Sequence, residues 1–323
     1  MNNFFKIFFP SIPKNRLFAR SFFSWGLRVV FSIGIFSLSA HFSVFAKLKV
    51  VGSIPPYSDL AKIIGGEKVE VVNFAPMNSD PHTFEPKPSQ LKEIMQADLY
   101  IACDLPFETA FLPKMKALNP KLKVVHLNSN FPLLPGDEEE HEQPSTLKKT
   151  LAWKKDGEKT GSWDTHTWLS PILGKLQAAI LLQAFTEQDP VSQIVYQERY
   201  HQFIDQADAL YFSLQKKIQP FLGETIFAYH GIEAYFAQAF GLNFKSLEVE
   251  GKEVTPQKMG QLLKDLKKSK KKVLFYSDLS HEEKAKELAR LAGAKIYFVN
   301  HYGLTWQASI SDLASSLLKA WSE

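Results

Sequence analysis

The sequence has almost no cysteine: it contains one in 323 residues. A single thiol cannot form a disulfide within the chain, so disulfide-stabilised scaffolds are excluded. Cys103 lies in the apolar segment LYIACDL, and a cysteine in such a setting is typical of a protein core. We therefore expect Cys103 to be a buried thiol.

An excess of basic charge is also absent from most of the chain. The net charge is +4, but residues 1–46 contain five basic residues and no acidic one, so the remainder carries 4 − 5 = −1. Nucleic-acid binding needs a basic surface, and we expect no nucleic-acid partner. The chain is otherwise of ordinary globular composition, and its length is enough for two domains with cores.

Residues 1–46 have the features of an export signal. A basic region precedes the apolar run LRVVFSIGIFSLSAHFSVFA. This run is short and interrupted by serines and by His41, which favours cleavage after Ala46 over the alternative of a retained membrane anchor. No cysteine follows the cleavage site, so we expect no lipoprotein anchor. The expected product begins at Lys47 and is located in the periplasm.

Strand-length apolar runs alternate with helical patterns along most of the chain. Runs this apolar are typical of mostly parallel sheets that helices cover on both faces. The expected strands lie at 48–54, 69–76, 98–104, 123–128, 225–231, 272–278 and 294–300.

Three helix boundaries follow from local sequence. The glycine pair at 65–66 predicts the end of a helix. Thr255, followed by a proline, predicts a helix start with the threonine as N-cap. Ser280 with Glu283 predicts a capping box at the start of another helix.

Residues 191–218 predict one long helix. No proline or glycine interrupts this stretch, and its apolar residues recur at intervals of three and four. At 1.5 Å per residue the helix would be about 42 Å long, enough to bridge two domains. We therefore predict an α/β fold of two Rossmann-like lobes with mostly parallel sheets, joined by this helix. The predicted divisions are a signal peptide at 1–46, an N-terminal lobe at 47–190, a connecting helix at 191–219 and a C-terminal lobe at 220–323.

The interval from Pro135 to about Gly161 is charged and poor in apolar residues. This composition predicts a mobile loop. The interval includes the segment DEEEHE, with His141 as its only histidine. A metal-collecting loop is one interpretation of that segment, and a solvated surface loop is the favoured one.

Three of the nine histidines stand at corresponding places in the predicted sheets. His82 follows a strand and lies between prolines, His166 lies where a loop becomes a helix, and His230 lies at the end of a strand. Ligand sites of open α/β sheets gather at the carboxyl ends of strands, so these imidazoles are expected to converge. Each histidine alone is also consistent with a surface or hydrogen-bonding role, and the three form no short metal motif such as HExxH. The residues alone therefore leave metal binding open.

Three segments resemble the substrate-binding proteins of zinc and manganese ABC transporters, a cluster that includes the periplasmic zinc-uptake proteins. DPHTFEPKPSQLKEIMQADLYI resembles the first metal-binding segment of that family, DTHTWLSP the second and FAYHGIEAYFAQAFGL the third. The resemblance runs from about Lys49 to the end of the chain and keeps the family's order and spacing. It implies a metal-type solute-binding protein, not an enzyme, with four-stranded sheets and a rigid connecting helix.

The resemblance also implies His82, His166 and His230 as three histidine ligands of a metal ion. The family's fourth position is usually acidic, and the aligned residue here is Asn300, with His301 beside it. A neutral amide suits a hard dication poorly, so a manganese-type site with two carboxylates is not supported. Three imidazoles with an amide oxygen, a water or His301 suit Zn²⁺.

Other side chains near the strand ends have structural interpretations. Asp278 is a further acidic candidate, but entry into the following helix is its favoured role. Tyr57 and Trp168 could line the cleft, and neither is assigned to the metal. The aromatic residues of the third segment are expected to lie in the core of the second lobe: Phe227, Tyr229, Tyr235, Phe236 and Phe240.

The expected function is capture of a divalent transition metal, foremost Zn²⁺, in the cleft between the lobes of an exported, monomeric solute-binding protein. The resemblance implies delivery of the metal to an inner-membrane ABC permease for uptake. Mn²⁺ or Fe²⁺ is an alternative cargo within the same family. Two alternatives from other classes are a zinc hydrolase, for which HExxH is missing, and an adhesin-like surface protein.

Overall fold

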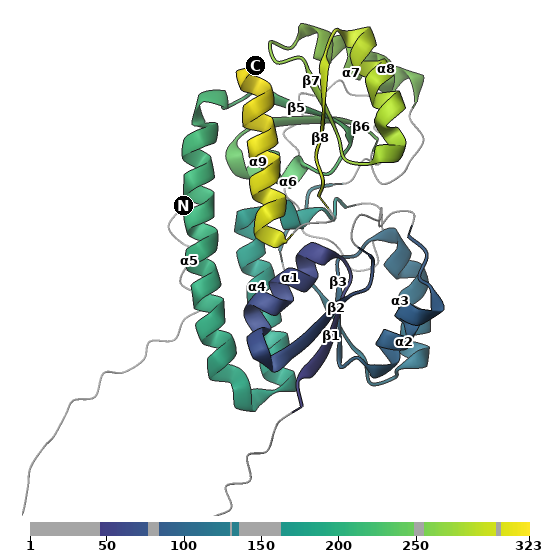
Figure 1. Ribbon diagram of the computed structural model, residues 1–323, viewed down its shortest axis with the longest axis vertical. Helices are drawn as coiled ribbons and strands as arrows, with labels where there is room; N and C mark the ends of the chain where they lie inside the picture. Colours follow the sequence, from purple (N-terminus) through teal and green to yellow (C-terminus); the bar gives the residue numbers. More distant parts are fainter. Residues whose placement is uncertain (1–45, 77–83, 130, 136–162, 249–254, 302–304) are drawn as a thin grey trace, which may run out of the picture. The chain divides into compact units, whose positions relative to one another are not determined.

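The computed structural model describes residues 46–76, 84–129, 131–135, 163–248, 255–301 and 305–323, which form two parallel sheets with their helices (Figure 1). All of these elements belong to one compact unit, Phe45–Glu323. The predictions for the export signal, for His82 and for the charged interval after Pro135 lie outside the described residues. None of the helices in the described part of the chain has the length and hydrophobicity to cross a membrane.

The first sheet has the strand order β2-β1-β3-β4, and all of its pairs are parallel. Each predicted strand is confirmed, and each ends before the apolar run does. Helices cover the inner strands, so all four residues of β3 are buried. The strands are β1 (Leu48–Gly52), β2 (Val69–Asn73), β3 (Leu99–Ala102) and β4 (Lys123–His126). The connecting helices are α1 (Pro55–Gly65), α2 (Pro88–Gln96) and α3 (Pro106–Leu118).

The second sheet repeats this topology in the order β6-β5-β7-β8, again with parallel pairs. The edge strand β6, with the sequence NFKSLE, was not predicted. An edge strand tolerates polar side chains. Lys245 of β6, for example, pairs with Asp265 of α7 at 2.6 Å. The strands are β5 (Thr225–His230), β6 (Asn243–Glu248), β7 (Val273–Tyr276) and β8 (Lys295–Phe298). The helices are α6 (Ala234–Phe240), α7 (Pro256–Lys268) and α8 (Glu282–Ala292).

One long helix runs alongside both sheets, and a second packs against it beside the first sheet (Figure 1). The predicted long helix is present as α5 (Gln193–Ile218), which follows α4 (Pro171–Gln188). The last helix, α9 (Trp306–Ser322), leaves the second sheet and packs against α1 and α5. Its first residue donates its N–H to Asp59 of α1 at 3.0 Å, and its indole lies 4.8 Å from the ring of Phe203 in α5.

The main apolar core is continuous between the two sheets. It contains Val50 and Leu99 of the first sheet, Ile226 and Phe275 of the second, and Trp306 of α9. A close-packed core resists continuous deformation, so a large movement of one lobe would have to break this packing. The division of the chain into lobes at 190 and 220 stays a prediction, because the core does not separate there.

Two of the three predicted helix boundaries are confirmed. Gly66 follows α1 with φ 54°, and a Cβ at this position would lie 2.5 Å from the Arg199 side chain. Glycine is therefore needed there both for its backbone conformation and for space. Thr255 Oγ1 accepts the Lys258 N–H at 3.2 Å, as expected of an N-cap.

The predicted capping box of Ser280 and Glu283 is wrong. Helix α8 begins at Glu282, one to two residues later than predicted, and its N-cap makes no side-chain hydrogen bond. The hydroxyl of Ser280 instead donates to Asp278 at 2.6 Å, and Asp278 also accepts the Ser280 N–H at 2.8 Å. Asp278 is thus a helix-entry residue, as favoured from the sequence: its carboxylate caps a short 3-10 turn, η5 (Leu279–His281), which leads into α8.

Candidate metal centre

His166 is the central residue of a tight turn at residues 164–167, here called the histidine turn. Its backbone has φ −78° and ψ 42°, and the Thr167 N–H donates to the Thr165 carbonyl at 2.8 Å. This is close to an inverse γ-turn, which presents one side chain at a sharp reversal of the chain. The chain then enters a short 3-10 turn, η2 (Thr167–Leu169), and α4, whose first turn Ser170 caps.

Asp164 fixes the ring of His166. Its Oδ1 lies 2.9 Å from His166 Nδ1 and accepts the His166 backbone N–H at 2.9 Å. Both side chains are almost completely buried, so the carboxylate selects the tautomer that carries a proton on Nδ1. Nε2 is then the basic nitrogen of the ring. A carboxylate behind an imidazole is the usual arrangement behind metal-bound histidines.

His230 approaches His166 from the second sheet. It is the last residue of β5, where it pairs in register with Glu248 of β6. Its side chain is nearly buried, and the two imidazole centroids lie 5.8 Å apart with their planes at 89°. The structure therefore brings together two of the three predicted histidines.

The second lobe also contacts the histidine turn through Tyr235 of α6. The Tyr235 hydroxyl donates to the Asp164 carbonyl at 2.6 Å and accepts the Leu134 N–H at 2.8 Å. Burial raises the pKa of this hydroxyl well above its ordinary range, so it stays a donor. Tyr235 thus ties the turn that carries His166 to the lobe that carries His230.

The two candidates for the fourth position lie just beyond β8. Asn300 is half-buried and His301 is fully buried. His301 Nε2 lies 2.9 Å from Glu233 Oε1, and Glu233 is also fully buried. Sequence reasoning missed Glu233, although a carboxylate three residues after His230 in the third segment was a usable signal. His301 is therefore held by a carboxylate, as His166 is.

The described residues on both sides of the segment that contains His82 make tertiary contacts. On one side, the Ala75 N–H donates to the Ser53 carbonyl at 2.9 Å. On the other, the ring of Phe84 packs at 5.8 Å from Phe74 and at 5.4 Å from Phe107. His82 itself is not among the described residues, and its role stays a prediction. No group of three or more metal-ligating side chains occurs within the described ranges, to which His82 does not belong.

Tyr57 and Trp168 do not line an open cleft, contrary to the expectation from their loops. Both are fully buried, and the indole of Trp168 lies 5.3 Å from the His166 ring. The aromatic residues of the third segment are buried, as predicted. Cys103 is likewise buried, with its thiol 3.1 Å from Ser53 Oγ, and burial raises the pKa of the thiol.

Two four-stranded parallel sheets packed with long helices, with His166 from the turn before α4 beside His230 from the end of β5, are the arrangement of a solute-binding protein of the metal type. The family described as "Zinc-uptake complex component A periplasmic" (ZnuA) matches residues 50–319. The chain belongs to this family.

The relatives include both zinc and manganese proteins. The high-affinity zinc uptake system protein ZnuA of Bacillus subtilis is 26% identical over 262 residues, which are 79% of this chain and 78% of the relative. The manganese ABC transporter substrate-binding lipoprotein PsaA of Streptococcus pneumoniae is 24% identical over 258 residues, with 78% and 79% covered. A solved structure of a ZnuA deletion mutant with zinc bound is 28% identical, with a TM-score of 0.72 over 86% of this chain and 99% of that one.

The chain is thus a metal ABC transporter substrate-binding protein of the zinc and manganese family, and the resemblance read from its three segments is confirmed. This is a family of exported transport proteins whose partners are an ABC permease and a metal ion. Several relatives are named as lipoproteins. The absence of a lipid anchor, which we expected for this chain, is therefore not a general property of the family.

Proposed function

We propose that this protein captures Zn²⁺ at the boundary between its lobes through His82, His166 and His230, and delivers it in the periplasm to an ABC permease. The observation that carries the proposal is the approach of His166 and His230, whose ring centroids lie 5.8 Å apart. Because one histidine comes from each lobe, a shared ion would favour one arrangement of the lobes over others. His82 is included because its segment matches the family.

The spacing of the two rings suits one tetrahedral ion. A Zn–N bond is about 2.0–2.1 Å, and the centre of an imidazole lies about 1 Å beyond its nitrogen, so two rings on one zinc have centroids about 5 Å apart. The observed 5.8 Å differs from this by a small side-chain adjustment.

The donor set favours zinc over manganese. Manganese sites are rich in carboxylate oxygens, whereas zinc accepts nitrogen-rich coordination. The two buried carboxylates near these histidines are already engaged: Asp164 with His166, and Glu233 with His301. Imidazole is therefore the donor that the boundary between the lobes offers.

Asn300 and His301 are the candidates for the fourth position. The contact between His301 Nε2 and Glu233 favours the tautomer whose basic nitrogen is Nδ1. His301 would therefore bind through Nδ1, while Asn300 would bind through its amide oxygen.

The proposal is tested by competitive loading of the metal-free protein. Zn²⁺, Mn²⁺ and Fe²⁺ are offered together at equal concentration, and bound metal is counted by native mass spectrometry. We expect one zinc per chain. His166→Ala and His230→Ala should each weaken zinc binding more than about 100-fold, beyond the roughly 10- to 100-fold effect of losing an outer-shell partner.

His201→Ala is the matched control, since this histidine is exposed on α5. It should load zinc like the unaltered protein. Preferential loading of manganese or iron would contradict the choice of metal. Loading that survives both His166→Ala and His230→Ala would contradict the ligand assignment.

A further inference from the structure

A buried network of neutral polar side chains surrounds the histidine turn. It consists of Tyr57 from α1, Asn128 just after β4, Thr167 in η2 and Gln177 in α4, and all four side chains are at least 96% buried. Burying so many polar atoms is costly unless they pair with one another. Such a network at a turn therefore calls for a reason beyond packing.

The four side chains bond mainly to each other. Thr167 Oγ1 donates to Asn128 Oδ1 at 2.5 Å. Tyr57 Oη lies 2.8 Å from Thr167 Oγ1 and 3.1 Å from Asn128 Oδ1. Gln177 Nε2 donates to Thr167 Oγ1 at 2.7 Å and to Tyr57 Oη at 2.8 Å. The hydroxyl of Thr167 is thus held by three partners from three elements.

The network holds both neighbours of His166. Asn128 Nδ2 donates to the Thr165 carbonyl at 3.3 Å, while the same residue's Oδ1 accepts from Thr167. Thr165 and Thr167 are the two residues whose backbone hydrogen bond closes the turn over His166. Asn128 is itself fixed by donating to the Cys103 carbonyl at 2.8 Å, at the end of β3.

We propose that Tyr57, Asn128 and Gln177 are positioning residues for the metal, because they lock the backbone on both sides of His166 before an ion arrives. The inference rests on the proposed role of His166 as a ligand. A ligand that is already ordered loses little conformational freedom on binding, so the same metal–nitrogen bond gives a tighter complex.

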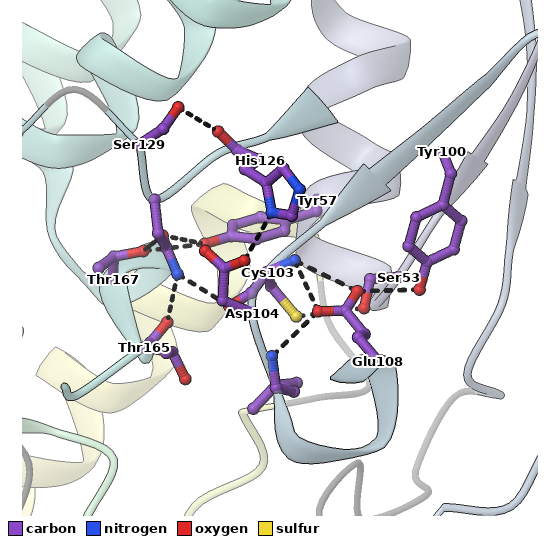
Figure 2. Close-up of polar contacts among 12 residues, drawn as sticks. Ser53, Tyr57, Tyr100, Cys103, Asp104, Glu108, His126, Ser129, Thr165 and Thr167 are labelled. Carbon is purple, nitrogen blue, oxygen red and sulfur yellow. Dashed lines mark hydrogen bonds and ion pairs between the residues drawn. The ribbon is translucent and has the colours of Figure 1, made fainter. Parts of the chain in front are cut away.

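A second buried network in the same lobe provides a matched control. The Tyr100 hydroxyl donates to Glu108 at 2.8 Å, and Glu108 also accepts the Leu105 N–H at 2.9 Å (Figure 2). Tyr100 is as buried as Tyr57, and within the described part of the chain its hydroxyl bonds to Glu108 and not to the histidine turn. Tyr57→Phe and Tyr100→Phe therefore delete the same hydroxyl from equally buried sites with different neighbours.

The experiment measures two quantities for each variant: zinc affinity by competition with a chelator, and unfolding of the metal-free protein by urea. Tyr57→Phe should weaken zinc binding about 10-fold or more, the effect expected of an outer-shell residue. Tyr100→Phe should leave zinc affinity unchanged even where it lowers stability. Equal zinc affinities for the two variants would overturn the inference.

A second pair of variants guards against a general loss of structure. Thr167→Val keeps the shape of the side chain but deletes the hydroxyl, and it should weaken zinc binding. Thr167→Ser restores the hydroxyl and should recover the affinity; a loss of affinity that persists in Thr167→Ser would show that the hydroxyl bonds do not position His166. His166→Ala is measured in the same series. Intact binding in His166→Ala would overturn the proposed function as well, while lost binding there with intact binding in Tyr57→Phe would overturn this inference alone.

Discussion

The histidine turn and the end of β5 position their imidazoles by different means. His166 lies in a turn that side chains from α1, α4 and the end of β4 hold in place. His230 belongs to a strand, and its position follows from the backbone pairing of β5 with β6. The position of His166 therefore depends on particular side chains, whereas the position of His230 depends on a sheet that many sequences could form.

The charged groups beside the two sites differ as well. Asp164 contacts both the backbone and the ring of His166 within one turn. Glu233 reaches a histidine 68 positions away, so it joins the start of α6 to the segment after β8. A local contact fixes a ring, whereas a distant one also holds two parts of the second lobe together.

The largest expected effect comes from breaking the distant pair. Glu233→Ala leaves the ring N–H of the buried His301 without its acceptor, and a buried donor without a partner costs about 1–3 kcal/mol, or more when the lost partner is charged. Urea unfolding of the metal-free protein measures this loss. Glu67→Ala is the control, because the Glu67 side chain is 97% exposed, and its effect should stay within about 0.5 kcal/mol. A loss below about 1 kcal/mol for Glu233→Ala would mean that the pair does not hold the lobe together.

The local pair should act on affinity more than on stability. Asp164→Asn keeps an oxygen that accepts from the His166 ring but removes the negative charge behind the ring, which would stabilise the positive charge of a bound ion. We expect zinc affinity to fall about 10-fold, toward the lower end of outer-shell effects. Isothermal titration in the presence of a chelator measures it. Asp208→Asn on α5, which removes only a partly exposed ion pair with Lys175, should leave the affinity intact. Equal affinities for both variants would refute the role of Asp164.

The two regions also meet through their helices, since α4 follows the histidine turn and α9 follows the His301 segment. A Cβ at Gly174 of α4 would lie 2.3 Å from the indole of Trp306, the first residue of α9. Gly174→Ala should therefore destabilise the protein by about 1–3 kcal/mol, the usual effect of overpacking. The control is Gly260→Ala in α7, where nothing lies within 4 Å of the added carbon. That variant should raise the thermal midpoint, because alanine favours a helix by up to about 1 kcal/mol.

The smallest effect is expected at the hydrogen bond between the lobes. Tyr235→Phe deletes the hydroxyl that bonds to Asp164 and Leu134, and the loss should be about 1 kcal/mol. Tyr276→Phe is the comparison, because the Tyr276 hydroxyl makes no hydrogen bond within the described part of the chain. If the two variants have the same denaturant midpoint, the Tyr235 hydroxyl does not stabilise the contact between the lobes.

The sequence was sufficient to predict seven of the eight strands of the described sheets and the place of His230 at the end of β5. Apolar runs reveal inner strands because both faces of an inner strand are covered, and a single histidine at the end of such a run stands out. The edge strand β6 escaped prediction because Lys245 and Ser246 interrupt its apolar pattern. The helical periodicity of α9 likewise contains no information about which lobe the helix packs against.

The support around His166 could not be predicted for a different reason. Asn128 and Gln177 are polar residues, and their sequence neighbours do not distinguish a buried network from a solvated surface. Some of their partners lie far away along the chain: Asn128 contacts Thr167 at a separation of 39 positions, and Gln177 contacts Tyr57 at a separation of 120. Pairings at such separations depend on the tertiary fold rather than on local pattern.

The return of α9 to the first lobe has a consequence for how the chain acquires its structure. Ile310, Leu313 and Leu317 share one core with Val50 and Leu99, which precede them by more than 200 residues. At a synthesis rate of about 5–20 residues per second, the first sheet waits on the order of ten seconds or longer for this helix. Until then one apolar face of α1 lacks its cover, and contacts this distant slow the search for the native state. We therefore expect the newly synthesised first lobe to bind chaperones that keep an incomplete chain from aggregating.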